Sequence, residues 1–244
     1  MNKIKLFSLL FIGAVLFSSC KDEVEAPGTA FAAFESYLSD VTVAPGQPLT
    51  KTINIFAANT TGSDRAINLV VKSNSTIGAA SYTMPTSVTI PANSSKASFD
   101  IVFVDAGLDI VQDQVLAVAM ESTDFYLGED IALNVAKGCN AGESKLKIAV
   151  TMDAYPEEVY WRIRDANTGA YILASQAAPG YGGLAGLSGT IRNAACLPAG
   201  DYLFQIYDQY GDGAGACSIS IDGSQIFATS GAYAGGTSHS FTIQ

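Results

Sequence analysis

Runs in which apolar and polar residues alternate recur along most of the chain, and Gly, Pro, Asn, Asp or Ser separates them. The clearest runs are 97–104 and 145–152, where every second residue is apolar. This period of two places one face of a strand in a core and the other in water. Nothing in the sequence reads as a long amphipathic helix. Many short strands with frequent turns predict an all-β chain built from two-sheet sandwiches.

The composition changes sharply near Gly138. Of 23 glycines, 16 lie at or after this residue, as do eight of the 11 tyrosines and the single tryptophan. Together with a chain length that suits two domains of ordinary size, this change predicts two consecutive antiparallel β-sandwich domains, at 30–137 and 138–244.

The first 19 residues have the pattern of a secretory signal peptide. Lys3 and Lys5 precede an uncharged apolar run at 6–17, and Ser18-Ser19-Cys20 follows. A helix over that run would rise only about 18 Å, which is short of the ~30 Å hydrocarbon core of a bilayer. We therefore expect a cleaved segment at 1–19 and no permanent transmembrane helix.

The residues around the expected cleavage site resemble a bacterial lipobox, in 16–20 (LFSSC), although Phe17 stands where a small or aliphatic residue is usual. The resemblance implies that Cys20 is acylated and that 20–29 forms a tether. Lys21-Asp22-Glu23 resembles the export signal of surface lipoproteins of the Bacteroidota. This implies anchoring in the outer membrane, facing the exterior; a solvated polar tether is the alternative.

The charge of the chain limits its partners. Removing 1–19 takes away two lysines and no acidic residue, so the formal charge falls from −10 to −12. A chain this acidic is not expected to bind nucleic acid, which requires clustered Lys and Arg against phosphates. It is also repelled by anionic lipid headgroups, so the lipid must provide the attachment to the membrane.

The stretch 82–105 (YTMPTSVTIPANSSKASFDIVFVD) resembles the Calx-β type of immunoglobulin-like domain. Some members of that family bind calcium with acidic residues after the last of these strands. Asp105, Asp109 and Asp113 occupy that region here, but the usual paired acids are thinned out. A solvated acidic loop is therefore the favoured interpretation.

The second half resembles a small β-sandwich module of secreted and surface proteins, whose pattern contains Thr-x-Asp-x-Tyr-Pro-x-Glu-x-x-Trp, Cys-Leu-Pro and Asp-x-Tyr-Gly-Asp-Gly. The matching residues are Thr151, Asp153, Tyr155, Pro156, Glu158, Trp161, Cys196, Leu197, Pro198, Tyr202, Phe204, Ile206, Asp208, Tyr210, Gly211, Asp212 and Gly213. The resemblance implies an accessory binding or structural role.

A calcium site is the main candidate for metal chemistry. The segment 208–213 resembles the first half of an EF-hand loop, but position twelve would be Ile219 rather than Glu, which excludes a self-contained EF-hand. We expect Asp208 and Asp212 to join Asp153 and Glu158 if their two turns share one end of the sandwich. The alternative is a turn whose Asp side chains cap backbone N–H groups.

Tyrosines near these turns are candidates for stacking on a sugar ring, since flat rings cover apolar ligand faces while the hydroxyls find polar partners. The candidate ligand-binding residues are Tyr155, Tyr181, Tyr210 and Tyr233. Core packing is the favoured role for Trp161.

Three cysteines remain after lipidation of Cys20. Export makes a disulfide plausible. We expect Cys196 to pair with Cys217, with Cys139 bonded to either of them as the alternative. A zinc site is not expected, because there is no Cys-x-x-Cys and His239 is the single histidine.

The function expected from these features is binding rather than catalysis. His239 has no evident nucleophile partner in the pattern, and no catalytic residue is assigned. We expect a lipid-anchored surface protein whose modules bind an extracellular glycan or protein, with calcium as a candidate cofactor. The alternatives are a structural or adhesive spacer with no small ligand and, less favoured, a hydrolase that uses paired carboxylates.

Overall fold

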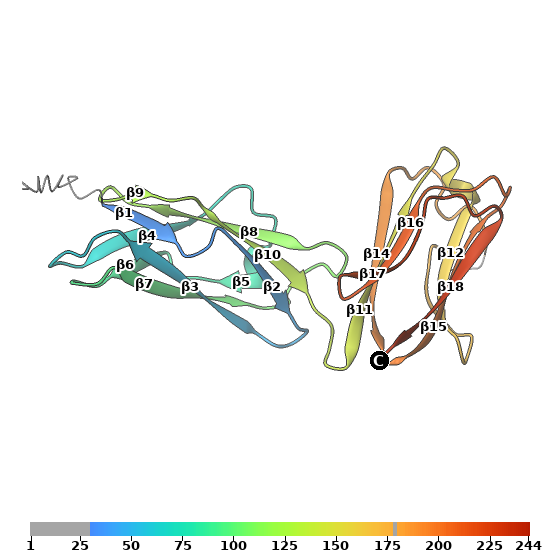
Figure 1. Ribbon diagram of the computed structural model, residues 1–244, viewed down its shortest axis with the longest axis horizontal. Helices are drawn as coiled ribbons and strands as arrows, with labels where there is room; N and C mark the ends of the chain where they lie inside the picture. The colour runs from blue at the N-terminus through green and yellow to red at the C-terminus, as the bar shows by residue number, and fades with distance from the viewer. Residues whose placement is uncertain (1–29, 178–179) are drawn as a thin grey trace, which may run out of the picture.

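A computed structural model describes residues 30–177 and 180–244. The expected signal peptide, Cys20 and the tether lie outside these residues. Among the described residues, no helix has both the length and the apolar character needed to cross a membrane. The chain forms two β-sandwiches that follow each other along the long axis of the molecule (Figure 1).

The first sandwich is built from ten strands in two five-stranded sheets. One sheet has the order β5-β7-β3-β1-β9 and the other β2-β10-β8-β4-β6. The strands are β1 (Phe31–Phe34), β2 (Leu38–Val43), β3 (Leu49–Ala57), β4 (Arg65–Val71), β5 (Tyr82–Thr83), β6 (Ser87–Ile90), β7 (Lys96–Phe103), β8 (Gln114–Glu121), β9 (Tyr126–Leu127) and β10 (Ile131–Lys137), with a 3₁₀ turn η1 (Ala79–Ser81) before β5.

The topology of this sandwich is immunoglobulin-like. The first strand is divided between the sheets, so that β1 pairs with β3 while β2 runs parallel to β10. β1, β3 and β7 then correspond to strands A, B and E, and β4, β8 and β10 to C, F and G. The divided strand explains the two parallel pairs in sheets that are otherwise antiparallel. These pairs are β1 with β9 and β2 with β10.

The predicted alternation fills the core of the first sandwich. Along β7 the exposed and buried positions alternate, and Ile101 and Phe103 are fully buried. β3 and β10 contribute Ile55 and Leu133 in the same way. Each such side chain contributes about 1.5–3 kcal/mol when it leaves water.

Within the described parts of 138–244, the second sandwich contains eight strands in two four-stranded sheets, with the orders β14-β11-β16-β17 and β13-β12-β15-β18. Every strand pair in it is antiparallel. The strands are β11 (Glu143–Thr151), β12 (Val159–Asp165), β13 (Tyr171–Ala174), β14 (Thr190–Pro198), β15 (Gly200–Asp208), β16 (Cys217–Ile221), β17 (Ser224–Thr229) and β18 (Gly236–Ile243), with a 3₁₀ turn η2 (Pro156–Glu158) before β12. Its core is separate from that of the first sandwich and includes the fully buried Trp161 and Phe204.

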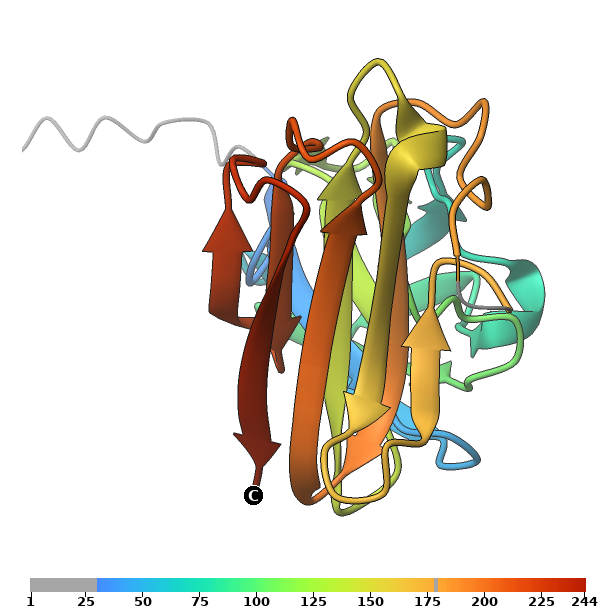
Figure 2. The same cartoon turned by 90° about the vertical axis from the view of Figure 1, so that its right-hand side faces the viewer.

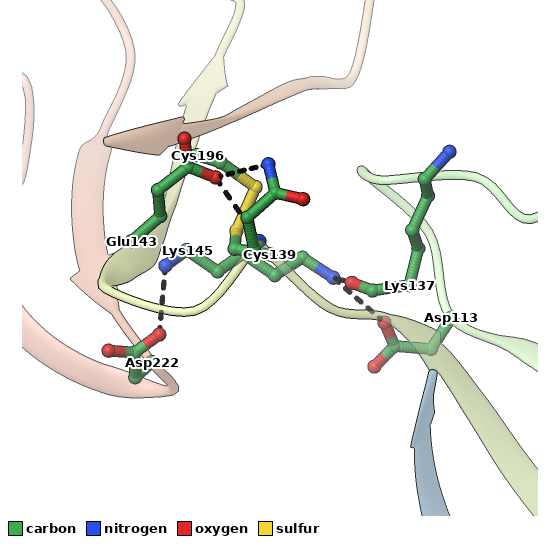
Figure 3. Close-up of a disulfide and its surroundings, with 8 residues drawn as sticks. Asp113, Lys137, Cys139, Glu143, Lys145, Cys196 and Asp222 are labelled. Carbon is green, nitrogen blue, oxygen red and sulfur yellow. Dashed lines mark hydrogen bonds and ion pairs between the residues drawn. A yellow bond between two sulfur atoms is a disulfide. The ribbon is translucent and has the colours of Figure 1, made fainter. Parts of the chain in front are cut away.

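A disulfide closes the junction between the sandwiches (Figure 3). Cys139, just after β10, bonds to Cys196 on β14, and their Cα atoms are 5.5 Å apart. Next to it the Lys145 Nζ donates a hydrogen bond to the carbonyl of Lys137 at 2.7 Å. Lys145 and Lys147 also lie 3.8 and 3.2 Å from the Asp113 carboxylate of the first sandwich. Strand β11 is therefore tied to the preceding domain.

The expected Cys196–Cys217 bond is wrong, and strand geometry gives the reason. Strand β11 lies between β14 and β16, where Cys196 pairs with Lys145 and Cys217 with Val150. Five residues along a strand span about 17 Å, whereas Cα atoms joined by a disulfide lie within about 7 Å. Cys217 also points into the core and is a free thiol.

The Cys217 thiol is expected to resist alkylation in the folded protein. Burial raises its pKa to about 12, so the reactive thiolate is scarce at neutral pH. The test uses a Cys20→Ser variant, in which Cys217 is the cysteine left outside the disulfide. Intact-mass spectrometry should show no iodoacetamide label on the folded protein and one label after denaturant is added. Rapid labelling of the folded chain at Cys217 would contradict its core position.

Candidate functional site

Four connections of the second sandwich gather at one end, which we call the loop end (Figure 2). They are the β11–β12 turn (152–158), the described parts of the β13–β14 loop (175–177 and 180–189), the β15–β16 loop (209–216) and the β17–β18 loop (230–235). Backbone hydrogen bonds join them: Gln209 N donates to Glu158 O at 3.0 Å, and Gly182 N donates to Glu157 O at 2.7 Å. The turn that holds Glu158 and the turn that follows Asp208 therefore lie at the same end of the sandwich, as a shared carboxylate site requires.

Close backbone contacts hold the β15–β16 loop in place. A Cβ on Gly215 would lie 1.7 Å from the carbonyl oxygen of Thr151. A Cβ on Gly231 would lie 1.9 Å from the carbonyl oxygen of Ala214. Only glycine permits these approaches, which explains part of the glycine enrichment of the second half.

Three carboxylates meet at the loop end. Glu158, Asp208 and Asp212 can each offer an oxygen such that all three oxygens lie within 4.8 Å of one another. Asp208 is buried and accepts hydrogen bonds from the backbone N–H groups of Tyr210 and Gly213.

The pKa of the Glu158 carboxyl is raised above its ordinary value of 4.5. The causes are partial desolvation and four nearby carboxylates, those of Asp212, Asp208, Glu157 and Asp153. The arrangement favours either a proton or a cation among these oxygens.

Asp153 does not belong to that group of oxygens. Its carboxylate accepts a hydrogen bond from Tyr155 N at 2.9 Å and so closes the turn that leads into η2. This is the backbone-capping role that the sequence left open as the alternative. Asp153 is close enough to raise the pKa of Glu158, but its place in a metal site is not supported by the geometry.

Three of the four tyrosines proposed for ligand binding are exposed. Tyr155, Tyr181 and Tyr210 lie in loop-end connections, and Tyr210 is 74% exposed. Tyr233 is the exception: it is only 9% exposed and belongs to the core cluster, so its ring cannot stack on a ligand. Burial raises the pKa of its hydroxyl, which has no hydrogen-bond partner among the described residues.

The outer face of the β13-β12-β15-β18 sheet carries residues that the sequence analysis did not assign to a site. Because Val159, Trp161 and Ile163 face the core, the residues between them face outward, and they are Tyr160 and Arg162. Around Arg162 lie Tyr171 from β13 and Tyr207 from β15. The same alternation that predicts Trp161 in the core could have identified these outward positions.

The acidic loop of the first sandwich has structural roles. The Asp109 carboxylate accepts hydrogen bonds from the backbone N–H groups of Val111 and Gln112, which lower its pKa. Asp113 pairs with Lys145 and Lys147 of the second sandwich. Of the three acidic residues considered for calcium in this loop, Asp109 and Asp113 therefore already bind donor groups of the protein.

Comparison with known proteins gives structural likeness without a family. The sequence matches no family model and no curated protein. A candidate carbohydrate-binding protein from Bacteroides ovatus ATCC 8483 is similar at 12% identity, over 84% of this chain and 71% of that one, with a TM-score of 0.41. A multidomain protein including DUF1735 from Bacteroides ovatus is similar at 13% identity, over 87% and 96%, with a TM-score of 0.39.

The CBD12 segment of CALX1.2 is similar at 10% identity, over 78% of this chain and 81% of that one, with a TM-score of 0.36. At such identities and scores the likenesses carry no argument about ligands. Fold and site together define a two-domain all-β protein with a loop-end cluster of carboxylates and exposed tyrosines.

Proposed function

We propose that this chain is a lipid-anchored surface protein that binds an extracellular glycan at the loop end of its second sandwich, with Ca²⁺ as a ligand-organising ion. The observation that carries the proposal is the convergence of Glu158, Asp208 and Asp212 beside exposed tyrosines. Ca²⁺ takes six to eight oxygen ligands, so three carboxylates leave positions for water or for sugar hydroxyls. Tyr155, Tyr181 and Tyr210 then provide rings for the apolar faces of the sugar.

The test of this function is binding of the full chain to a glycan array with calcium and with EDTA. We expect binding that requires calcium and falls at least tenfold in Tyr210→Ala, because that ring is exposed and supports no core contact. Phe56→Ala is the matched control, as it removes a partly exposed ring from the first sandwich. Equal binding by the wild type and Tyr210→Ala would contradict the proposal.

Calcium binding should also depend on pH. The pKa of Glu158 is higher in the folded state than in the unfolded state. The protonated Glu158 therefore stabilises the fold at pH values below the unfolded-state pKa, and this stabilisation is lost as the pH rises through the folded-state pKa. When Glu158 is charged, a bound calcium ion offsets the repulsion between its carboxylate and the neighbouring acidic side chains. We therefore expect calcium to raise the Tm more at pH 7 than at pH 4.5.

Glu158→Gln separates this effect from general stabilisation by salt. In calcium-free buffer at pH 7 the variant should melt at a higher temperature than the wild type, because one repelling charge is gone. Calcium should then leave its Tm unchanged. The exposed Glu121→Gln is the control and should keep the calcium response. A calcium response that survives in Glu158→Gln would count against the site.

The membrane anchor is proposed on the sequence alone, since Cys20 lies outside the described residues. Mass spectrometry of the native product should show an N-terminal acylated Cys20, and protease added to whole cells should cleave the protein. An intact leader would rule out this location.

A structural spacer is the second candidate function. The end-to-end sandwiches, joined by the Cys139–Cys196 bond and the Lys145 and Lys147 contacts to Asp113, favour a stiff two-domain rod. Failure on the glycan array together with co-purification of envelope proteins would favour this role.

A further inference from the structure

The outer face of the β13-β12-β15-β18 sheet carries two arginines that form no ion pair with any carboxylate of the described chain. Arg162 and Arg164 both project from this face of β12, and within the described ranges no carboxylate lies within 4.0 Å of either guanidinium. The chain has only four arginines and a net charge of −10, so two unpaired arginines side by side are unexpected. Asp201, on the same face near the end of the sheet, is hydrogen-bonded to Thr242.

Arg162 is held in a fixed position by neutral groups. Its Nε donates to Gln205 Oε1 at 2.9 Å, one terminal nitrogen to the Tyr171 hydroxyl at 2.6 Å, and the other to the Tyr207 hydroxyl at 3.0 Å. Its Cζ also lies 5.3–5.9 Å from the ring centroids of Tyr207, Tyr171 and Tyr160. These contacts orient the guanidinium without neutralising it.

The groups left over at this cluster are donors. Guanidinium has five N–H groups, of which these bonds use three. The hydroxyls of Tyr171 and Tyr207 accept from Arg162, so their own protons are available to a further acceptor. Tyr160 is buried, its hydroxyl has no hydrogen-bond partner among the described residues, and its ring stacks on that of Tyr207 at 6.1 Å. Arg164 adds a buried Nε that also lacks a partner.

A shallow depression of about 330 Å³ adjoins the cluster, lined by Gln205, Tyr207, Gly235, Gly236, Thr237 and Ser238. A Cβ at Gly236 would lie 3.0 Å from the Tyr207 ring, so glycine keeps this edge of the ring uncovered. Figure 2 shows this sheet on the side of the molecule that faces away from the first sandwich. The face is therefore open to a ligand.

We propose that this face is a second binding site, specific for an anionic sugar residue. A donor-rich surface with an uncompensated guanidinium matches an acceptor-only anion better than a neutral hydroxyl, which must also donate. Tyr171, 49% exposed, and Tyr207 supply rings for the sugar, and the depression holds the adjoining unit. The site uses none of the loop-end carboxylates and none of the exposed loop-end tyrosines, and it needs no calcium.

The test is titration calorimetry on the full chain in EDTA, with trigalacturonic acid, its methyl ester and a sulfated maltotriose as probes. We expect an anionic trisaccharide to bind and the neutral ester to bind at least tenfold more weakly. Whichever of the carboxylated and sulfated probes binds more tightly identifies the anion. An acidic peptide, Glu₄, should bind at least tenfold more weakly than that sugar.

The variants assign the binding to this face. Arg162→Lys keeps the charge but loses the planar fork, and should weaken binding at least tenfold. Tyr171→Phe keeps the fold and the ring but removes the hydroxyl, and should weaken binding severalfold. Tyr210→Ala should bind normally, which separates this site from the loop end. The proposal would be overturned if neither anionic sugar binds, or if the peptide binds more tightly than the sugar. It would also be overturned if Arg162→Lys and Tyr171→Phe both bind the sugar as tightly as the wild type does.

Discussion

Replacing Cys139 and Cys196 with alanine is expected to lower the free energy of unfolding of the second sandwich by about 4 kcal/mol. The bond closes a loop with a sequence separation of 57 residues, and the chain-entropy model gives about 4 kcal/mol for a loop of that length. The loss is large beside the 5–15 kcal/mol that stabilises a typical domain. Urea denaturation followed by Trp161 fluorescence measures it, because Trp161 is fully buried in this core.

The control is chemical reduction of the unmodified chain. Dithiothreitol should shift the midpoint of its transition to that of the double variant and should leave the variant itself unchanged. The first sandwich has its own core and should unfold at the same denaturant concentration in both proteins. An unchanged transition in the double variant would mean that the Cys139–Cys196 bond does not form.

Gly215→Ala is expected to destabilise the second sandwich by about 3 kcal/mol or more. The new Cβ would lie 1.7 Å from the carbonyl oxygen of Thr151, which belongs to backbone and cannot swing aside. Overpacking of this kind costs about 1–3 kcal/mol, and more where backbone must move. Because the β15–β16 loop carries Asp212, the displacement should also abolish the calcium-induced rise in Tm.

Gly62→Ala provides the matched comparison in the first sandwich. A Cβ there meets nothing within 4 Å, and its backbone is not in the left-handed region. Thermal unfolding of this variant should stay within about 0.5 kcal/mol of the wild type, as expected for a surface change away from packed features. A Gly215→Ala protein with the stability and calcium response of the wild type would show that the loop does not approach β11 this closely.

The fold was largely predictable because its information is local. Alternation in 97–104 and 145–152 predicts β7 and β11 with their buried faces, and Trp161 lies in the core as favoured. The disulfide was not predictable, since sequence spacing does not tell which strand separates two cysteines. Cys196 and Cys217 are near in sequence, yet β11 lies between their strands.

The candidate sites depend on which turns share an end and which residues share a face. The resemblance of 208–213 to a metal loop identified carboxylates that do converge with Glu158, but it also suggested Asp153, which closes its own turn instead. Tyr233 was misassigned because a loop tyrosine reads as exposed, whereas this one packs into the core. The Arg162 cluster joins three strands, and no single segment of sequence shows that combination.

The loop-end site is tested most directly by a crystal structure of the protein grown with calcium chloride. The proposal predicts an ion with carboxylate oxygens of Glu158, Asp208 and Asp212 at 2.3–2.6 Å. Empty density at this position in crystals that contain millimolar calcium, with the three carboxylates turned apart, would contradict it.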